Sequence, residues 1–223
     1  MTKSRNERLG LRPLTARSVM LSVLLGTNPP RLPVAKLVAV AELFGISDGA
    51  ARTALHRMVT AGDVSLENGR YRLNARLVDR QRRQEQSRVD TRVPWNGRWC
   101  LAVVNATSRA AADRAALRRA MSQQRLGELR EGVWARPDNL GVRHLPAPID
   151  EQCTIWIADA PTGFSRDELV TRLWDLPTWG ARAEALLEAF DDHDDIAGRF
   201  MVAAATLHHL LDDPLLPDGL CPP

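Results

Sequence analysis

Residues 34–73 decide the fold, and they read VAKLVAVAELFGISDGAARTALHRMVTAGDVSLENGRYRL. Apolar residues recur at helical spacing as far as Phe44, which predicts an amphipathic helix with one buried face. Gly45 ends that helix. Ser47 or Asp48 can cap the next one, because a short side-chain oxygen accepts a free backbone N–H there. The stretch therefore predicts two helices joined by a tight turn.

The second helix is expected over residues 48–61, with two unlike faces. Polar and basic residues fill its outer face, and the inner face should hold Ala51, Leu55, Met58 and Val59. After Gly62, two short runs flank Asn68-Gly69, the strongest short signal for a β-hairpin, because both residues tolerate positive φ. With a preceding helix over residues 15–25 and a loop at residues 28–30, these elements predict a winged helix-turn-helix.

The outer face of the second helix and the hairpin, or wing, supply candidate DNA contacts. Such a helix enters the major groove, where arginine reads base edges or phosphates, and the wing follows the backbone. The alternatives are an ordinary three-helix module with a solvated polar face, or a winged helix that binds protein instead of DNA. The candidate DNA-binding residues are Ser47, Arg52, Thr53, His56, Arg57, Arg70 and Arg72.

Charge is divided unevenly along the chain. Residues 1–94 hold 17 Lys and Arg against 8 Asp and Glu, a net charge of +9, whereas residues 95–223 hold 13 against 19, a net charge of −6. A basic half gains free energy from counterion release when it binds a polyanion. The acidic half would be repelled by DNA and needs another role. The division favours double-stranded DNA as the partner of the N-terminal half.

Composition places the chain among soluble globular proteins, with 44% hydrophobic and 26% charged residues. The N-terminus has no apolar signal-peptide core, and the apolar runs are too short to span a bilayer. Cys100, Cys153 and Cys221 are far apart in sequence, which indicates reduced thiols and not a zinc site or disulfides. We therefore expect a cytoplasmic protein without a membrane partner.

The rest of the chain predicts two further units. Strands are expected at residues 99–105, 129–135 and 153–158, with a helix capped by Ser108 after the first strand. This order indicates a small α+β sandwich of ferredoxin type, with one element hidden between residues 140 and 151. Ser165 and Glu168 form a capping box that opens the first of three C-terminal helices.

The expected fold class is therefore α+β multidomain. Its four parts are a winged helix-turn-helix at residues 1–78, a basic linker helix at 79–94, a middle ferredoxin-like (Cas2-like) α+β domain at 95–162 and a C-terminal helical domain at 163–223.

Six short motifs in this order resemble the PaaX-like family, the phenylacetic acid degradation repressors. They are FGIS (44–47), ARTALHRM (51–58), LRR (117–119), GVWARP (132–137), WDL (174–176) and DPLLP (213–217). The resemblance implies a winged-helix N-terminal domain, a Cas2-like middle domain and a helical C-terminal domain. It also implies a homodimeric transcriptional regulator, often a repressor that an aryl acyl-CoA thioester releases from DNA.

The acidic half contains all six tryptophans of the chain. Most of them should form core, but a cleft between the middle and helical domains could use some to hold a small-molecule effector. An aryl acyl-CoA needs an apolar slot for its ring and cations for its phosphates. The candidate ligand-binding residues are Arg118, Arg119, Trp134 and Arg136.

An enzymatic alternative is a metal-dependent nuclease of the Cas2 type. Such a nuclease needs a carboxylate at the end of its first strand to hold a metal ion, and that position here is about Asn105, a neutral amide. The sequence also lacks a Gly-x-Ser-x-Gly elbow and a phosphate loop, and the acidic run at residues 191–195 is not spaced like a calcium loop. We therefore expect no catalytic residue, no metal and no cofactor.

The sequence thus predicts a DNA-binding transcriptional regulator. We expect a repressor of a catabolic operon that binds an operator with an inverted repeat and is released by a small effector.

Overall fold

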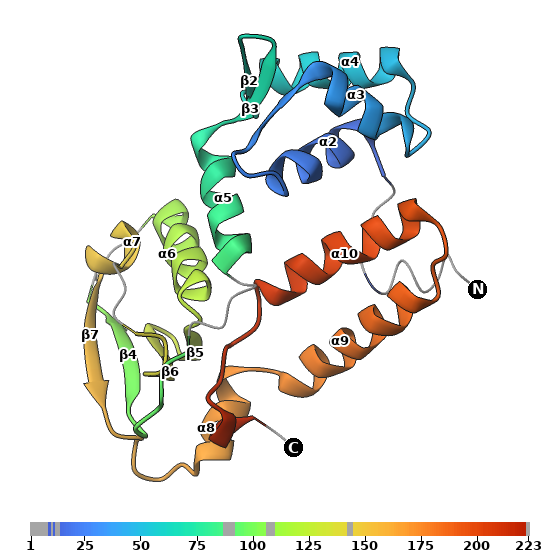
Figure 1. The fold of residues 1–223 in the computed structure, drawn as a ribbon. Coiled ribbons are helices and arrows are strands. Elements are labelled where there is room, and N and C mark those ends of the chain that lie inside the picture. Colours follow the sequence, from blue (N-terminus) through green and yellow to red (C-terminus); the bar gives the residue numbers. More distant parts are fainter. Residues whose placement is uncertain are drawn as a thin grey trace. The chain divides into compact units, whose positions relative to one another are not determined.

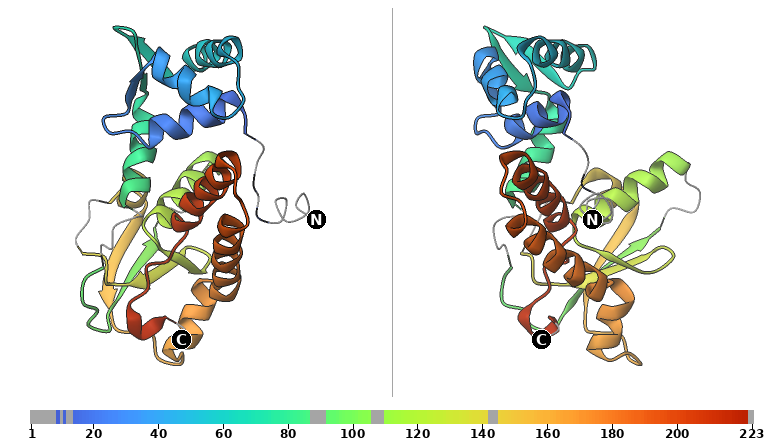
Figure 2. Two further views of the ribbon diagram at one scale, coloured as in Figure 1. Left: turned by 45° about the vertical axis from the view of Figure 1, so that its right-hand side comes forward. Right: turned by 90° about the vertical axis from the view of Figure 1, so that its right-hand side faces the viewer.

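The computed structural model describes residues 9, 11, 14–86, 92–105, 110–141 and 145–221 of the 223-residue chain. The chain is mixed α and β (Figures 1 and 2) and forms two compact units. Unit 1 consists of Met1–Val89 with Arg182–Leu210, and unit 2 of Asp90–Ala181 with Leu211–Pro223. Each unit is therefore built from two separate stretches of sequence.

The described part of unit 1 contains three successive helices, α2 (Ala16–Leu25), α3 (Val34–Glu42) and α4 (Asp48–Thr60). Thr15 caps α2, and Ser47 caps α4 by accepting the Ala50 N–H at 3.4 Å. Helix α3 ends at Glu42, three residues before the predicted Gly45, and Gly45, with a φ of 70°, lies in the turn that leads to α4. The apolar faces of the three helices meet in one core that fully buries Leu24, Leu37, Leu55 and Met58.

A three-stranded sheet completes this part of unit 1. Its strands β1 (Arg31–Pro33), β2 (Val64–Glu67) and β3 (Arg70–Leu73) lie in the order β1-β3-β2. The predicted hairpin is confirmed, since Asn68 and Gly69 have φ values of 50° and 71°. Strand β1 directly follows the loop predicted at residues 28–30 and was not itself predicted: three residues beside Pro29-Pro30 carry no strand signal, and only pairing with β3 makes them a strand.

The remaining helices of unit 1 come from distant parts of the chain. Helix α5 (Ala75–Gln86) follows the hairpin, and residues 182–210 add the end of α9 (Leu176–Asp191) and all of α10 (Ile196–Leu210). The rings of Phe44 and Phe200 are 4.9 Å apart and join the α3–α4 turn to α10. The N-terminal Leu9 and Leu11 are buried against a second cluster made by Leu186, Ala189 and Val202.

Unit 2 contains a four-stranded antiparallel sheet in the order β5-β6-β4-β7. Helix α6 (Ala111–Gln123) follows the first strand, and the short helix α7 (Ala147–Asp150) precedes the last. This is the split β-α-β order of a ferredoxin-like sheet. The strands are β4 (Trp99–Val104), β5 (Gly127–Arg130), β6 (Val133–Pro137) and β7 (Cys153–Ala158).

Two predictions for this sheet are corrected. The single strand expected at residues 129–135 is wrong, because β5 and β6 form a hairpin that turns at Glu131-Gly132, where Gly132 has a φ of 75°. The turn lacks an Asn-Gly signal, so the sequence predicted one continuous strand. Helix α6 begins at Ala111 with Ala110 at its N-cap, and the predicted cap, Ser108, lies outside the described residues.

A hydrophobic core of unit 2 packs the sheet against α8 (Arg166–Leu173) and the C-terminal segment. The predicted capping box of Ser165 and Glu168 opens α8. A Cβ on Gly127 would lie 2.8 Å from the carbonyl oxygen of Leu173, so only glycine allows β5 this close to α8. Buried Asn139 donates from Nδ2 to the carbonyl oxygen of Leu215 at 2.8 Å, which fastens the C-terminal segment to the sheet. No helix in the described part of the chain is both long and apolar enough to cross a membrane.

Candidate nucleic-acid interface

Helix α4 presents a polar face to solvent. Arg52, Thr53, His56 and Arg57 are all exposed on it, whereas Ala51, Leu55 and Met58 are buried against α2 and α3. Val59 was expected on the inner face, but it is 39% exposed. Successive residues of a helix are rotated by about 100°, which places Val59 at the edge of the stripe that the core covers.

The polar side chains of α4 are held to different degrees. Arg52 donates from Nε to both carboxylate oxygens of Asp48, at 3.0 and 2.9 Å, and this ion pair raises the pKa of Arg52. The Thr53 hydroxyl donates back to the carbonyl oxygen of Gly49 at 2.8 Å. Within the described residues, the Arg57 guanidinium and the His56 imidazole have no hydrogen-bond partner. The helix therefore carries one arginine that is already oriented and one that is not.

Three arginines gather on one face of the unit 1 sheet, which we call the wing arginine face: Arg31, Arg70 and Arg72. Arg31 lies directly opposite Arg72 in the β1–β3 register. Like charges in directly opposed positions of neighbouring strands destabilise a sheet. Glu67 lies opposite Arg70, and its carboxylate is 3.8 Å from the Arg72 guanidinium. One carboxylate among three cations leaves this face positive.

The wing arginine face borders a hollow of about 570 Å³, together with Pro29, Pro30 and Asn68. Its walls combine an excess of guanidinium groups with the polar turn of the wing, so it suits an anion. Arg31 was not predicted as a contact, since residues 31–33 were assigned to no helix or strand and had no predicted neighbour across a sheet.

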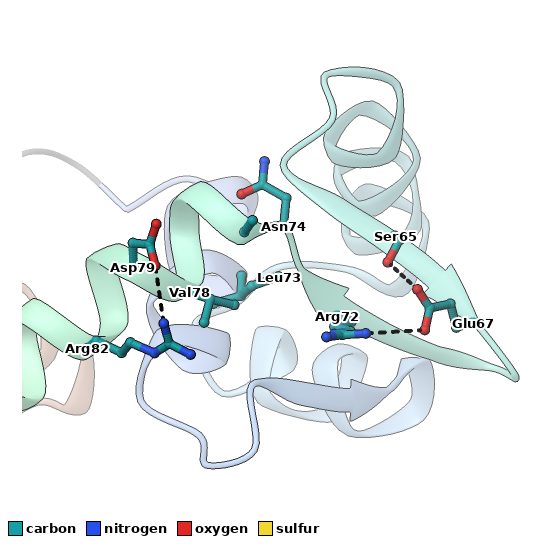
Figure 3. Close-up of a pocket in the computed structure, with 9 residues that line it drawn as sticks. Ser65, Glu67, Arg72, Leu73, Asn74, Val78, Asp79 and Arg82 are labelled. Carbon is teal, nitrogen blue, oxygen red and sulfur yellow. Dashed lines mark hydrogen bonds and ion pairs between the residues drawn. The ribbon is translucent and has the colours of Figure 1, made fainter. Parts of the chain in front are cut away.

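A second hollow, of about 410 Å³, lies between the wing and α5 (Figure 3). Two ion pairs line it, Arg72 with Glu67 at 3.8 Å and Arg82 with Asp79 at 3.5 Å. The Ser65 hydroxyl also donates to Glu67 at 3.0 Å. Charge is balanced within this hollow, so it attracts an anion less than the wing arginine face does.

A buried carboxylate ties together the elements that carry α4 and the wing. Asp63, only 3% exposed, accepts hydrogen bonds from Arg17 of α2 at 2.6 Å and from Arg76 of α5 at 3.2 Å. The Asp63 backbone adds a further contact, since its carbonyl oxygen accepts the N–H of Asn74, which lies between β3 and α5. Nothing in the sequence indicates this role, because an aspartate after Gly62 is also typical of a solvated turn.

The candidate ligand-binding residues lie in unit 2, and the structure brings only some of them together. Arg118 pairs with Glu128 at 2.9 Å and lies over the Trp134 ring at 5.8 Å. Arg136 is buried in β6 and donates to the carbonyl oxygen of Pro137 at 2.9 Å. Arg119 is exposed on α6, without a contact to those residues in the described structure.

A hollow of about 250 Å³ adjoins Trp134 within unit 2. Leu126, Leu173 and Trp174 contribute apolar walls. The charged lining residues are Arg125 and three carboxylates, Glu128, Asp212 and Asp213. This volume and charge suit an aromatic ring and disfavour phosphate groups.

The structure places a hydrogen-bonded amide where a Cas2-type nuclease would need a metal ligand. The Asn105 side chain follows β4 and is bonded to the Thr154 hydroxyl at 2.6 Å. Across the described ranges, no group of three His, Cys, Asp or Glu side chains could hold a metal ion. In the acidic run, Asp195 accepts the Gly198 N–H at 2.7 Å at the start of α10, which lowers the pKa of this carboxyl.

Fold and site together define a mixed α+β protein with an exposed basic helix and an arginine-bearing β-hairpin in its N-terminal half. Residues 15–79 match the family model described as PaaX-like protein, and residues 92–170 match that of the PaaX protein central Cas2-like domain. The solved structure of the uncharacterized protein Rv0674 from Mycobacterium tuberculosis is 43% identical, with a TM-score of 0.76, over 93% of this chain and 87% of that one. No curated protein matches the chain. The chain belongs to the PaaX-like family.

Proposed function

We propose that this protein is a sequence-specific, DNA-binding transcriptional regulator that represses a catabolic operon, such as one for phenylacetate. The observation that carries the proposal is the set of exposed arginines on α4 and on the wing arginine face, within a half of the chain whose net charge is +9. Membership of the PaaX-like family supports a regulatory role over an enzymatic one.

In this proposal the first 78 residues act as a winged helix-turn-helix. Helix α4 enters the major groove, where Arg52 and Arg57 reach base edges, with Ser47, Thr53 and His56 beside them. Residues 79–94 link this domain to the ferredoxin-like domain at 95–162, and residues 163–223 form the helical domain.

Replacing Arg31, Arg70 and Arg72 together by alanine should weaken binding to every duplex alike. The face is shallow and positive, so it can neutralise phosphates without reading bases. The slope of log affinity against log salt concentration should fall by about 0.9 for each phosphate that the variant no longer neutralises. Fluorescence anisotropy with a random-sequence duplex of about three helical turns measures this slope, with Arg119→Ala as the control on an exposed arginine of unit 2.

A reduction in affinity confined to one DNA sequence would show that the wing arginines read bases. If the parent protein shows no salt-dependent binding to random duplex, DNA binding itself is contradicted and the protein-interaction alternative is favoured.

The proposed operator complex contains two copies of the chain, paired through residues 95–223. A single winged helix covers a short half-site, so useful specificity needs two, and the operator should be an inverted repeat. Sedimentation velocity should find a dimer at micromolar concentration and two chains on each operator. A monomer that binds its operator one to one would contradict this pairing.

The proposed effector is an aryl acyl-CoA thioester. The hollow at Trp134 has room for the aromatic ring, and the phosphates outside it are proposed to contact the exposed Arg119 of α6 and Arg118, which they would compete for with Glu128. Calorimetry with phenylacetyl-CoA should detect binding, which Arg118→Ala and Arg119→Ala together weaken and the control Arg130→Ala does not. The same ligand should release the protein from its operator, which requires different affinities for the two states. A dissociation constant above about 100 μM, or roughly −5.5 kcal/mol, would rule out this effector class.

A further inference from the structure

The ion pair between Asp48 and Arg52 on α4 orients the Arg52 guanidinium before any ligand binds. A guanidinium has five N–H donors, one on Nε and two on each Nη. Asp48 receives the Nε donor with both carboxylate oxygens, and the Nη1 and Nη2 donors of Arg52 have no partner in the described structure. The side chains of both residues are more than half exposed, at 57% and 51%. The free edge of the guanidinium is therefore the edge that Nη1 and Nη2 form.

That free edge is the one that recognises guanine. Arginine reads guanine by donating two parallel hydrogen bonds to O6 and N7, and the Nη1 and Nη2 groups of a guanidinium presented end-on supply them. Ordering a long side chain on binding lowers affinity by about 2- to 10-fold, and a carboxylate four residues earlier on the helix reduces that loss by fixing the guanidinium plane in advance. Arg57 has no such partner among the described residues, so the two arginines of α4 are not equivalent.

The same carboxylate opposes binding to DNA in general. Asp48 is the first residue of α4, and in the proposed complex that end of the helix faces the polyanion. A negative charge there reduces the net positive charge that releases counterions. Asp48 thus lowers affinity for all sequences while it favours one base.

We propose that Asp48 is a positioning residue that sets DNA specificity by presenting Arg52 end-on to a guanine. This inference rests on the proposed DNA-binding function. Asp48 acts through Arg52 and itself touches no base.

The test uses the full-length protein and two probes: the duplex that the protein enriches from a random-sequence library, and a scrambled duplex of the same composition. Asp48→Ala should bind the scrambled duplex more tightly, with a salt slope steeper by up to about 0.9. It should bind the enriched duplex relatively less well, so that the ratio of the two affinities falls about 2- to 10-fold, the fold-change equivalent to the ordering cost of one side chain. A merely structural defect would weaken both complexes.

Two further variants test whether Asp48 acts through Arg52. Asp48→Asn keeps an oxygen that can accept from Nε, so it should share the tighter non-specific binding but retain part of the specificity ratio. In an Arg52→Ala background, Asp48→Ala should leave the ratio unchanged. Glu67→Ala is the matched control, since it removes a carboxylate beside Arg72 on the wing and should raise non-specific affinity without changing the ratio.

The outcomes separate the inference from the function beneath it. If the library yields no enriched sequence, the proposed function fails. If a sequence is enriched but Asp48→Ala changes both affinities by the same factor, the function stands and the inference is overturned. If Asp48→Ala still lowers the ratio without Arg52, Asp48 contacts a base directly and the positioning role is wrong.

Discussion

Replacing Arg52 and Arg57 together by alanine is expected to remove sequence-specific DNA binding. An arginine bidentate to guanine contributes about 1–3 kcal/mol of discrimination, so removing both side chains should weaken operator binding at least about 30-fold. Both side chains lie on the exposed face of α4, so the fold should survive. A gel-shift titration measures the change in affinity. Arg182→Ala, on the exposed surface of α9, is the control within the same unit.

The two single variants show how much of the lost operator affinity comes from base contacts and how much from phosphate contacts. Arg52→Ala should relax discrimination at one base pair, whereas a purely phosphate role for Arg57 would leave discrimination unchanged and lower the salt slope. If the double variant binds its operator like the parent while its circular dichroism is unchanged, α4 is not the recognition helix.

Replacing Arg17 and Arg76 together by alanine should strongly lower the free energy of unfolding of unit 1. The Asp63 carboxylate is almost fully buried, and these two arginines supply its hydrogen bonds from α2 and α5. An uncompensated buried charge costs about 3–5 kcal/mol of unfolding free energy. Adding Asp63→Asn to the double variant should restore part of that stability, because the amide needs no counter-ion.

The distribution of tryptophan provides an internal control for this experiment. All six tryptophans lie in unit 2, so their fluorescence follows that unit, whereas circular dichroism follows the helices of both. The double variant should lower the circular-dichroism midpoint and leave the tryptophan midpoint near that of the parent. A variant as stable as the parent would show that Asp63 is not a structural centre of unit 1.

Local signals predicted the helices of unit 1 and its hairpin well. Helical periodicity, the Ser47 cap and the Asn68-Gly69 turn all act within a few residues, so the sequence displays them directly. Strand β1 and the role of Asp63 depend on partners far along the chain, Arg72 for Arg31 and Arg17 for Asp63, and no local pattern encodes those pairings. The β5–β6 hairpin was hidden for another reason, since Glu131-Gly132 forms a turn without a strong turn signal.

The residues of the candidate site also differ in whether local sequence predicts their arrangement. The exposed face of α4 follows from spacing alone, and the i,i+4 relation of Asp48 and Arg52 is also visible in the sequence. The wing arginine face is not visible in the sequence, because Arg31 joins Arg70 and Arg72 only through the register of β1 with β3. Proximity in sequence misled in unit 2, where Arg118 and Arg119 are neighbours but only Arg118 meets Trp134, since adjacent helix residues point about 100° apart. The assignment of all these residues to DNA or effector stays a prediction.

The interleaving of the two units has a consequence for biosynthesis. The first core of unit 1 uses residues 20–77 and can form early, but Leu9 and Leu11 find their partners only after Val202 has been made. The core of unit 2 around Trp99 likewise waits for Leu216 and Leu220. Domains usually fold in order as the ribosome releases them, whereas here both units are completed by the same late stretch of polypeptide. A ribosome that stalls within residues 182–220 would therefore leave two unfinished cores exposed to chaperones and proteases at once.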